Sequence, residues 1–404
     1  MIYMDKVVYH QQSLRIHQRK HGPHLFIVGY FESLPDDFQG SLRFLEEQLL
    51  ARLNQEKAVV IHERWFGSEE YLSLVKTAWA KADQPTQLHA CVTAIDGKPC
   101  YSGNGKSCNG FSGIQIEAVI PGEKATCPEP ITDKEGIIRG HQWKENGARF
   151  LMIQDMQDLG LSEFRPQQTT EALRRAEALL QGQGLDYRSV ARTWIYLDKI
   201  LEWYTPFNEA RSAFYRRVGI MPDIEKSEVT PARECYLPAS TGIRGRNLSG
   251  AACTIDLIAA EIPEDSGFTV RRLTNRKQKD AFRYGAAFAR ASVTENSDYA
   301  EVQISGTASI DETGASVCLG DTEAQIRRTL DTIEALISEA GFTLTDICSA
   351  TAFIKQEKDL PLFLKIMEEK GLSDLPMVIC KADVCRDELL FELDGIAGRE
   401  KKRN

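Results

Sequence analysis

The sequence lacks long hydrophobic runs, and nothing in its 404 residues approaches the ~20 apolar residues that a membrane-spanning helix needs. Its N-terminal segment also lacks the apolar core and the small-residue cleavage site of a signal peptide. These two absences predict a cytoplasmic protein with no membrane partner.

The ten cysteines form no CxxC pair. Cys91, Cys100 and Cys108 bracket a glycine-rich turn without a matching pair of histidines, so no zinc site is expected there.

Positive charge is also scarce, because 58 acidic residues outnumber 49 basic ones and the formal net charge is −9. Nucleic-acid binding needs clustered Lys and Arg, and the basic stretches 271–279 and 399–403 are short. We therefore expect no nucleic-acid partner.

Histidine is limited to seven residues, and the four near the N-terminus are too irregularly spaced for a helical metal site. The four N-terminal histidines are His10, His17, His21 and His24. We expect no metal and no organic cofactor.

The amino-acid composition is typical of a globular protein, with 42% hydrophobic and 26% charged residues. Its length suggests two or three domains. Apolar residues alternate between strand and helix periods along the chain, which predicts an α+β fold. In the first part of the chain we expect strands at 24–30, 58–63, 87–94 and 111–122, and helices at 38–53 and 68–82.

The same order of elements returns twice. The second set has strands at 150–154, 187–197 and 250–260, and helices at 169–183 and 206–218. The third has strands at 300–309, 347–355 and 389–394, and helices at 322–340 and 359–369. Gly184 and Gly341 are expected to end their helices, Asp321 to begin one, and Pro361 to lie in a first turn.

The strands that close the three units are similar in sequence: GIQIEAVI, ACTIDLIA and LFELDGIA. Their acidic residues Glu117, Asp256 and Asp394 are 139 and 138 residues apart. A fixed period with a constant order of elements indicates an internal repeat, although three unrelated stretches with accidental spacing would be the alternative. We assign repeat 1 to residues 1–125, repeat 2 to 140–262 and repeat 3 to 267–398.

Glu392 is distinguished by this comparison. In its closing strand Leu389, Phe391 and Leu393 are expected on one face, and Glu392 on the other. The equivalent residues are Gln115 in repeat 1 and Thr254 in repeat 2, so only one of three equivalent clefts would hold a carboxylate. A buried carboxylate is costly without partners, which suggests a catalytic role; the alternative is a solvated strand face.

The third repeat resembles the Rid family, also called YjgF or endoribonuclease L-PSP. The resemblance lies in ISGTASIDETGASVCLGDTEAQIRRTLDTIEALISEAGFTLTDICSATAFIK. Members of that family are homotrimers of a βαββαβ unit, with active sites between subunits. The resemblance implies that this chain is a single-chain pseudo-trimer of three Rid-like repeats, in which repeat 1 is degenerate, and that it is monomeric.

Three motifs together are similar to those of the chorismatases, which cleave the enolpyruvyl ether of chorismate and release pyruvate. They are RTWIY with WYTPFNEAR, LPASTGIRGRN, and FARAS…ISGTASI with ADVCRDELLFE, and the similarity covers roughly residues 140–397. It implies that Glu392 is the catalytic acid. Cys385 and Ala291 match two positions that differ between chorismatase subtypes. The two residues belong to different subtypes, so the resemblance does not predict which product forms.

Two departures from these families matter. The chain has SIDETG where chorismatases have an SIVG-like turn. Rid deaminases carry an Arg shortly after a conserved Pro, whereas Pro376 is followed by Met377 and Val378. A substrate carboxylate would therefore need an Arg from elsewhere, because the guanidinium fork binds carboxylates in bidentate fashion. The candidate substrate-binding residues are Arg192, Tyr196, Arg211, Arg244, Arg290, Cys385 and Arg386.

Three of these assignments leave alternatives open. Strand alternation places Arg192, Trp194 and Tyr196 on one face, either as a cleft wall or as a core Trp beside a surface ion pair. The loop LPASTGIRGRN either cradles an anion with its backbone N–H groups or is a plain connection. Cys385 is either a nucleophile or, with no nearby His, a residue that lines the cleft.

The function predicted is a chorismatase-like lyase or hydrolase that acts on a small carboxylated enol ether. Glu392 would protonate the enol carbon, and its raised pKa would come from a partly dry cleft. The alternatives are a Rid-type enamine or imine deaminase, and a non-catalytic pseudo-trimer that binds a small ligand.

Overall fold

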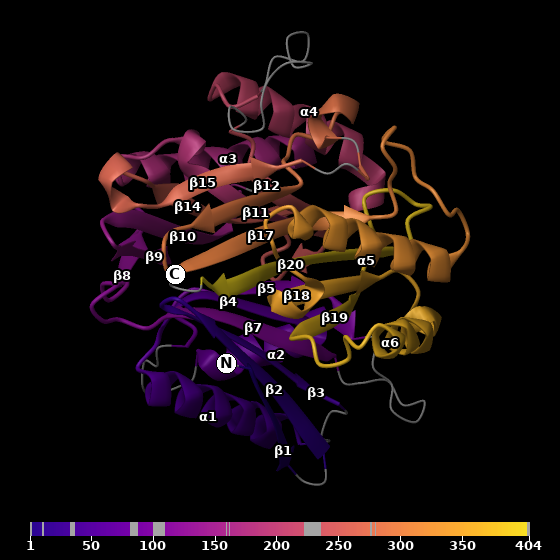
Figure 1. Cartoon of the computed structure of the whole chain (residues 1–404), viewed down its shortest axis with the longest axis horizontal. Coiled ribbons are helices and arrows are strands. Elements are labelled where there is room, and N and C mark those ends of the chain that lie inside the picture. The colour runs from indigo at the N-terminus through magenta and orange to yellow at the C-terminus, as the bar shows by residue number, and fades with distance from the viewer. Residues whose placement is uncertain are drawn as a thin grey trace.

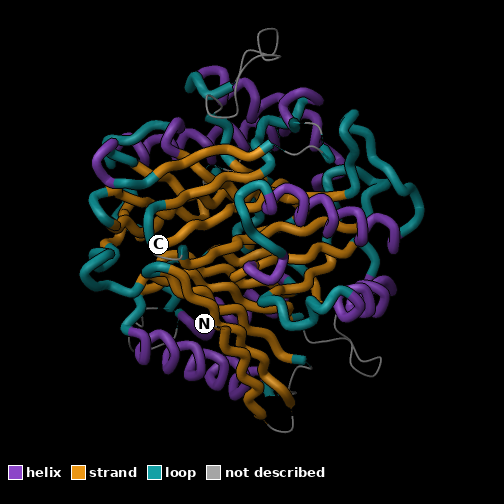
Figure 2. Tube along the Cα trace, in the orientation of Figure 1, coloured by secondary structure: helices purple, strands orange, loops and turns teal. Residues whose placement is uncertain are grey.

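The computed structural model describes residues 2–9, 12–32, 37–80, 88–99, 110–158, 160, 162–221, 236–274, 277–278 and 280–401. The strands form three sheets in the interior, and the long helices lie on the outside (Figures 1 and 2). Three similar sheets in one chain confirm the predicted α+β pseudo-trimer. Among the described helices, none combines the length and the apolar character that crossing a membrane requires.

The first sheet has the strand order β1-β2-β3-β7-β4-β5-β13. Helices α1 (Phe38–Glu56) and α2 (Glu69–Trp79) belong to the same part of the chain. Its strands are β1 (Ile2–Tyr9), β2 (Gln12–His21), β3 (His24–Phe31), β4 (Val59–Gly67), β5 (Thr93–Asp96), β7 (Phe111–Val119) and β13 (Arg246–Asn247).

The second sheet has the order β12-β11-β14-β10-β9-β8, and its helices are α3 (Arg165–Gly182) and α4 (Ile200–Arg217). Its strands are β8 (Glu129–Thr132), β9 (Ile138–Glu145), β10 (Ala148–Met156), β11 (Val190–Leu197), β12 (Ala239–Arg244) and β14 (Cys253–Glu261).

The third sheet has the order β15-β16-β17-β20-β18-β19-β6, with helices α5 (Thr322–Ser338) and α6 (Leu360–Glu369). Its strands are β6 (Lys98–Pro99), β15 (Thr269–Leu273), β16 (Ala291–Glu295), β17 (Tyr299–Ala308), β18 (Ile347–Ile354), β19 (Met377–Lys381) and β20 (Phe391–Glu400). In all three sheets the closing strand (β7, β14 or β20) lies beside the strand between the two helices.

Each sheet is extended by backbone from another repeat. Strand β13 of repeat 2 pairs with β5 of repeat 1, and β6 of repeat 1 pairs with β19 of repeat 3. Ala289 of repeat 3 forms a parallel bridge with Ala239 of repeat 2. The three pairings form a cycle, in which one edge strand of each sheet is paired with backbone from another repeat. The sequence pattern did not predict these pairings. The exact boundaries of the repeats remain a prediction.

Four large hydrophobic clusters hold the described part of the chain together, beside a small fifth cluster of Ala281, Ala286 and Phe288. Three of them fill the space between one sheet and its own helices. The fourth lies between the sheets and combines residues from all three repeats, among them Phe26, Trp194 and Ile396. Burying apolar side chains on both faces of every sheet makes the repeats parts of one packed body, since hydrophobic stabilisation grows with the apolar area removed from water.

The predicted helix signals are confirmed. The Asp321 side chain caps α5 by accepting a hydrogen bond from the Ala324 N–H (2.9 Å), and Gly341 adopts a positive φ just beyond that helix. Gly184 does the same after α3, and Pro361 lies in the first turn of α6. Each residue acts for the reason expected: a carboxylate satisfies free N–H groups, and glycine tolerates the left-handed turn.

Three predictions about local structure were wrong. Helix α4 begins at Ile200, before the expected Pro206, because a kink at Trp203 lets a first turn precede the proline. The stretch LPASTGIRGRN was expected to be a loop, either an anion cradle or a plain connection, but it contributes strands β12 and β13, which pair with β11 and β5. Leu389 precedes β20 and packs in the cluster between the sheets, whereas Phe391 and Leu393 pack against the helices of repeat 3.

Candidate active site

Glu392 lies near the start of β20, where it is paired with Ala308 on β17 and with Phe353 on β18. Only 4% of the residue is exposed, so the alternative of a solvated strand face is wrong. Burial and, to a lesser extent, the nearby Asp394 raise the pKa of its carboxyl group to about 8 against the opposing effects of Arg192 and Arg290. A carboxyl group with this pKa is largely protonated near neutral pH and can act as an acid.

The two equivalent positions are hydrogen-bonded to protein. The Gln115 amide donates to the Ala350 carbonyl oxygen (2.6 Å), and the Thr254 hydroxyl accepts from the Asn247 amide. By contrast, Glu392 has no hydrogen-bond partner among the residues that the structure describes. A buried polar group without a partner is rare and is found at catalytic sites, where a ligand supplies the missing contact.

Asp394 ties repeat 3 to repeat 2 next to Glu392. It accepts hydrogen bonds from the Arg192 guanidinium (3.1 Å) and from the Thr241 hydroxyl (2.7 Å). The same Thr241 oxygen accepts from Arg192 (2.5 Å) and from the Gly306 N–H (3.1 Å). This network fixes the strand that carries Glu392 against β12 of the neighbouring repeat.

Arg192 is completely buried, so the alternative in which it forms a surface ion pair is wrong. Burial lowers the pKa of its guanidinium to about 10, against the opposing effect of Asp394. Its guanidinium carbon lies 4.8 Å from the centre of the Trp194 ring, which is itself in the core. Two of its nitrogens, Nε and Nη1, have no hydrogen-bond partner among the described residues.

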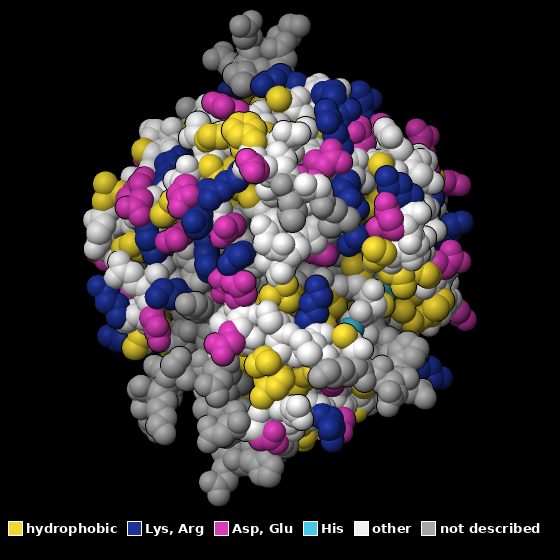
Figure 3. Space-filling model, turned by 180° about the vertical axis from the view of Figure 1, so that it is seen from behind, with side chains coloured by type: hydrophobic (Ala, Val, Ile, Leu, Met, Phe, Trp, Pro, Cys, Tyr) yellow, Lys and Arg dark blue, Asp and Glu magenta, His cyan; other side chains and the backbone are white. Residues whose placement is uncertain are grey.

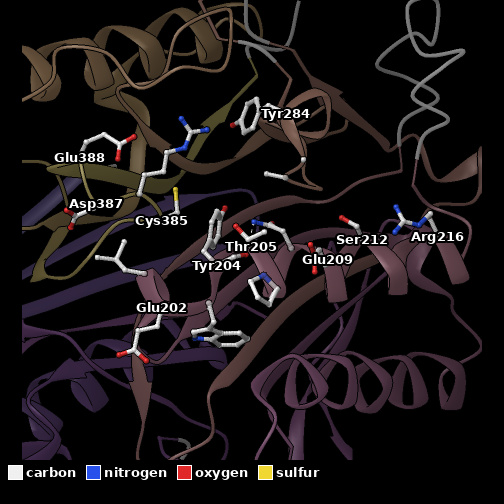
Figure 4. Close-up of a pocket in the computed structure, with 17 residues that line it drawn as sticks. Glu202, Tyr204, Thr205, Glu209, Ser212, Arg216, Tyr284, Cys385, Asp387 and Glu388 are labelled. Carbon is white, nitrogen blue, oxygen red and sulfur yellow. Dashed lines mark hydrogen bonds between the residues drawn. The ribbon is translucent and has the colours of Figure 1, made fainter.

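A cavity of about 710 Å³ lies between repeats 2 and 3, beside this network. One wall is α4, including Tyr204, and the other consists of the segments 284–286 and 385–388 (Figure 4). Its volume falls within the range of small-molecule binding sites. Both basic and acidic side chains reach it: Arg216 and Arg386, and Glu202, Glu209, Asp387 and Glu388.

Two aromatic rings connect three of the predicted arginines. The guanidinium carbons of Arg211 and Arg290 lie 5.9 and 5.3 Å from the centre of the Phe288 ring. Arg290 also donates a hydrogen bond to the Tyr284 hydroxyl (2.8 Å), and Arg386 lies 5.5 Å from the centre of that ring. Of these residues Tyr284 and Arg386 line the cavity, whereas Arg211, Arg290 and Glu392 are not among its lining residues.

Cys385 lines the cavity beside Tyr204 (Figure 4). Burial and the nearby Glu392 raise the pKa of its thiol to about 12. A thiol with so high a pKa is a poor nucleophile, because the thiolate is the reactive form. The structure thus favours the alternative in which Cys385 lines the cleft.

Two candidates lie elsewhere. The Tyr196 hydroxyl accepts a hydrogen bond from Arg64 of repeat 1 (3.3 Å), and Arg244 forms an ion pair with Asp96 of repeat 1 (2.6 Å). Both are contacts between repeats 1 and 2, away from the cavity. Strand alternation predicted the face of β11 on which Tyr196 lies. It could not show that repeat 1 packs against Tyr196.

Sequence reasoning missed Thr241, Gly306 and the aromatic residue Tyr284 as parts of this site. Thr241 lies within the motif STGIRG, which was interpreted as an anion-binding loop. Gly306 was part of the ISGTAS strand, and no pattern showed that a carboxylate lies against it. Their roles depend on contacts between repeats, which periodicity within one strand does not report.

Gly306→Ala is expected to displace the Glu392 carboxylate. A Cβ atom at this position would lie 2.1 Å from Glu392 Oε1 and 3.1 Å from the Thr241 methyl carbon. The flexible end of Glu392 would move, and because a shift of 1 Å in a reacting group can lower activity about 10²-fold, we expect a loss of that order in kcat. Gly242→Ala on β12 is the control, since its Cβ would make only an ordinary 3.9 Å contact. Equal kcat values for the two variants would contradict the placement of Glu392.

Three comparisons with known proteins support the resemblance. A family model described as endoribonuclease L-PSP matches residues 286–397. The 3-hydroxybenzoate synthase of Streptomyces hygroscopicus is 28% identical over 324 residues, which cover 71% of this chain and 86% of that protein. A crystal structure of a chorismatase has a TM-score of 0.58 at 18% identity, covering 84% of this chain and 93% of that one.

A shorter relative is the 3-aminoacrylate deaminase RutC of Acinetobacter baylyi, which is 29% identical over 97 residues, 24% of this chain and 77% of that protein. The fold and the matches together define the class of protein: a Rid-like α+β pseudo-trimer. Residues 286–397 are thus similar to the endoribonuclease L-PSP family, and the fold as a whole is similar to that of a chorismatase.

Proposed function

We propose that this protein is a chorismatase-like enzyme that cleaves the enolpyruvyl ether of chorismate, or of a related small carboxylate, and releases pyruvate. The observation that carries the proposal is the buried Glu392, whose pKa is raised to about 8 and whose neighbours are Arg192 of repeat 2 and Arg290 of repeat 3. Two relatives bear the enzyme names chorismatase and 3-hydroxybenzoate synthase, which agrees with an enzymatic role.

In the proposed reaction Glu392 donates its proton to the methylene carbon of the enol ether. The new C–H bond leaves a cation at the carbon that bears the ether oxygen, and the Glu392 carboxylate stabilises it. Water adds to this carbon and returns a proton to the carboxylate. The resulting hemiketal transfers its hydroxyl proton to the ring oxygen as the C–O bond breaks, so pyruvate and the ring alcohol are released.

Arg386, which lines the cavity, is proposed to bind a substrate carboxylate together with Arg211 and Arg290, which are connected to it through the rings of Phe288 and Tyr284. Arg192 is better described as a positioning residue. It holds Asp394, and through Thr241 it fixes the backbone at Gly306, against which the Glu392 carboxylate lies. Cys385 would contribute to the shape of the pocket as a neutral thiol.

Incubation with chorismate, with pyruvate measured through lactate dehydrogenase, tests the proposal. We expect stoichiometric pyruvate, because the described cleft combines a proton donor with anion-binding arginines. Absence of pyruvate above background would refute it. Ammonia released from 2-aminoacrylate would instead support the deaminase alternative, which the RutC similarity motivates. If both assays are negative and small aromatic carboxylates raise the Tm, the chain is a binding protein.

A further inference from the structure

A second cluster of charged side chains lies where the three repeats meet, away from the cavity. It contains His24 and Glu117 of repeat 1, Glu145 of repeat 2 and Glu301 of repeat 3, and each residue is at most 6% exposed. Ionised groups at this depth are stable only when they are paired or bind a metal. The mechanism proposed for Glu392 uses none of them.

His24 is held in one orientation by a carboxylate. Its Nε2 lies 3.0 Å from Glu145 Oε1, and Glu145 also accepts hydrogen bonds from the Tyr299 hydroxyl (2.5 Å) and the Trp143 indole N–H (2.6 Å). This is the arrangement in which a carboxylate orients a metal-binding histidine and leaves the other ring nitrogen free. The free nitrogen, Nδ1, lies 3.5 Å from Glu117 Oε1 and is without a hydrogen bond among the described residues.

Glu117 is the unsatisfied member of the cluster. It is only 3% exposed, and within the described part of the chain neither of its carboxylate oxygens has a hydrogen-bond partner. Its counterparts in the other repeats are satisfied across repeat boundaries: Asp394 by Arg192 and Thr241, and Asp256 by His62 (3.0 Å) and Thr93 (2.7 Å). The Glu117 oxygens and His24 Nδ1 are therefore buried donor atoms without a hydrogen bond, which are atoms that a metal ion can bind.

The third carboxylate, Glu301, faces the same point. The donor atoms of His24, Glu117 and Glu301 all lie within 4.8 Å of one another. Glu301 is oriented by His21 (2.8 Å) and by the Gln303 amide (2.7 Å). A cavity of about 20 Å³ that His24, Tyr299, Glu301 and Gln303 help to line adjoins the cluster, and it is large enough for one water molecule.

The surroundings of His24 favour a cation of high charge. Three carboxylates, Glu117, Glu145 and Glu301, lie around this imidazole. The ligands are one imidazole nitrogen and carboxylate oxygens, a set that suits zinc and neighbouring transition metals.

We propose that repeats 1 and 3 are joined by a buried divalent transition-metal ion, bound by His24 Nδ1, Glu117 and Glu301, with Glu145 of repeat 2 orienting His24 and with Zn²⁺ as the probe of choice. Tetrahedral ligands at about 2.1 Å from one ion lie about 3.4 Å apart, so the three side chains must close by up to about 1.4 Å when the ion binds. The expectation of no metal rested on histidine spacing in the sequence. The ligands instead come from strands β3, β7 and β17, which are distant in sequence.

Metal analysis of the full chain tests this site. After incubation with Zn²⁺ and gel filtration, we expect about one zinc ion per chain by mass spectrometry. The Glu117→Gln variant is expected to retain at least about tenfold less. His89→Gln is the matched control, because His89 also contacts two carboxylates, Glu63 (2.9 Å) and Glu46 (3.1 Å), but both of its ring nitrogens are occupied. This control should retain zinc as the wild type does.

A second measurement separates metal binding from folding. Removing metal with a chelator should lower the Tm of the wild type, and added Zn²⁺ should restore it, because an ion that binds only the folded state stabilises it. Glu117→Gln should fold and show no such shift. A wild-type chain that retains no zinc, or a variant that retains as much as the wild type, would overturn the proposal.

Discussion

Replacement of Glu392 by Gln is expected to lower kcat for pyruvate release by at least about 10²-fold while the protein remains folded. The amide has nearly the same size and fits the same space beside Gly306, but it cannot donate a proton to carbon. Circular dichroism and Tm would establish folding, and the coupled pyruvate assay would give kcat. Glu400→Gln is a suitable control, since it changes an exposed Glu on the same strand.

The same substitution has an expected effect on stability. The folded-state pKa of Glu392 is about 8, above its unfolded value of 4.5, so folding favours the protonated form. Its stabilising contribution is fully present below pH 4.5 and is lost as the pH rises through 8. Glu392→Gln should therefore become more stable than the wild type at high pH, by an amount on the order of several kcal/mol. A variant that fails to fold would show that the Glu is structural.

Arg192→Met is expected to destabilise the protein by about 3–5 kcal/mol, because it leaves the Asp394 carboxylate buried without its charged partner. Arg192 and Asp394 are 0% and 2% exposed at the side chain, and their ion pair joins repeats 2 and 3. Urea denaturation gives the free energy of unfolding. An exposed ion pair, Arg217 with Glu177, provides the comparison. The Arg217 side chain is 49% exposed, so Arg217→Met should lower the free energy of unfolding by less than about 1 kcal/mol.

The double variant Arg192→Met with Asp394→Leu isolates the cause of that loss. Removing both charges should recover much of the stability, since a buried ion pair can often be replaced by apolar residues of similar size. Activity should not recover, because the contacts that position the strand of Glu392 would still be missing. A single variant within about 1 kcal/mol of the wild type would contradict the proposed importance of this pair.

The repeats and Glu392 could be predicted from sequence because their signals are local. Strand alternation, helix caps such as Asp321 and the constant spacing of Glu117, Asp256 and Asp394 each depend on residues close in the chain. The polar strand β2, by contrast, contains few apolar residues, although its Leu14 and Ile16 are fully buried. Its burial comes from tertiary packing, which overrides local preference.

Contacts between repeats could not be predicted from sequence. Arg192 and Tyr196 share one strand face, but one meets Asp394 of repeat 3 and the other meets Arg64 of repeat 1. The choice depends on how three sheets pack around a common centre, and no periodicity records it. On the face in Figure 3, Lys and Arg side chains lie among Asp and Glu side chains.

The pH dependence of kcat/KM for pyruvate release from chorismate tests the central claim most directly. The groups that face Glu392 are Asp394, Arg192, Arg290 and Cys385, and the acid must be protonated to act. We predict a profile that is high near neutral pH and falls about tenfold per pH unit above an apparent pKa near 8. A profile that stays level through pH 8 and beyond, or no pyruvate at any pH, would contradict the account.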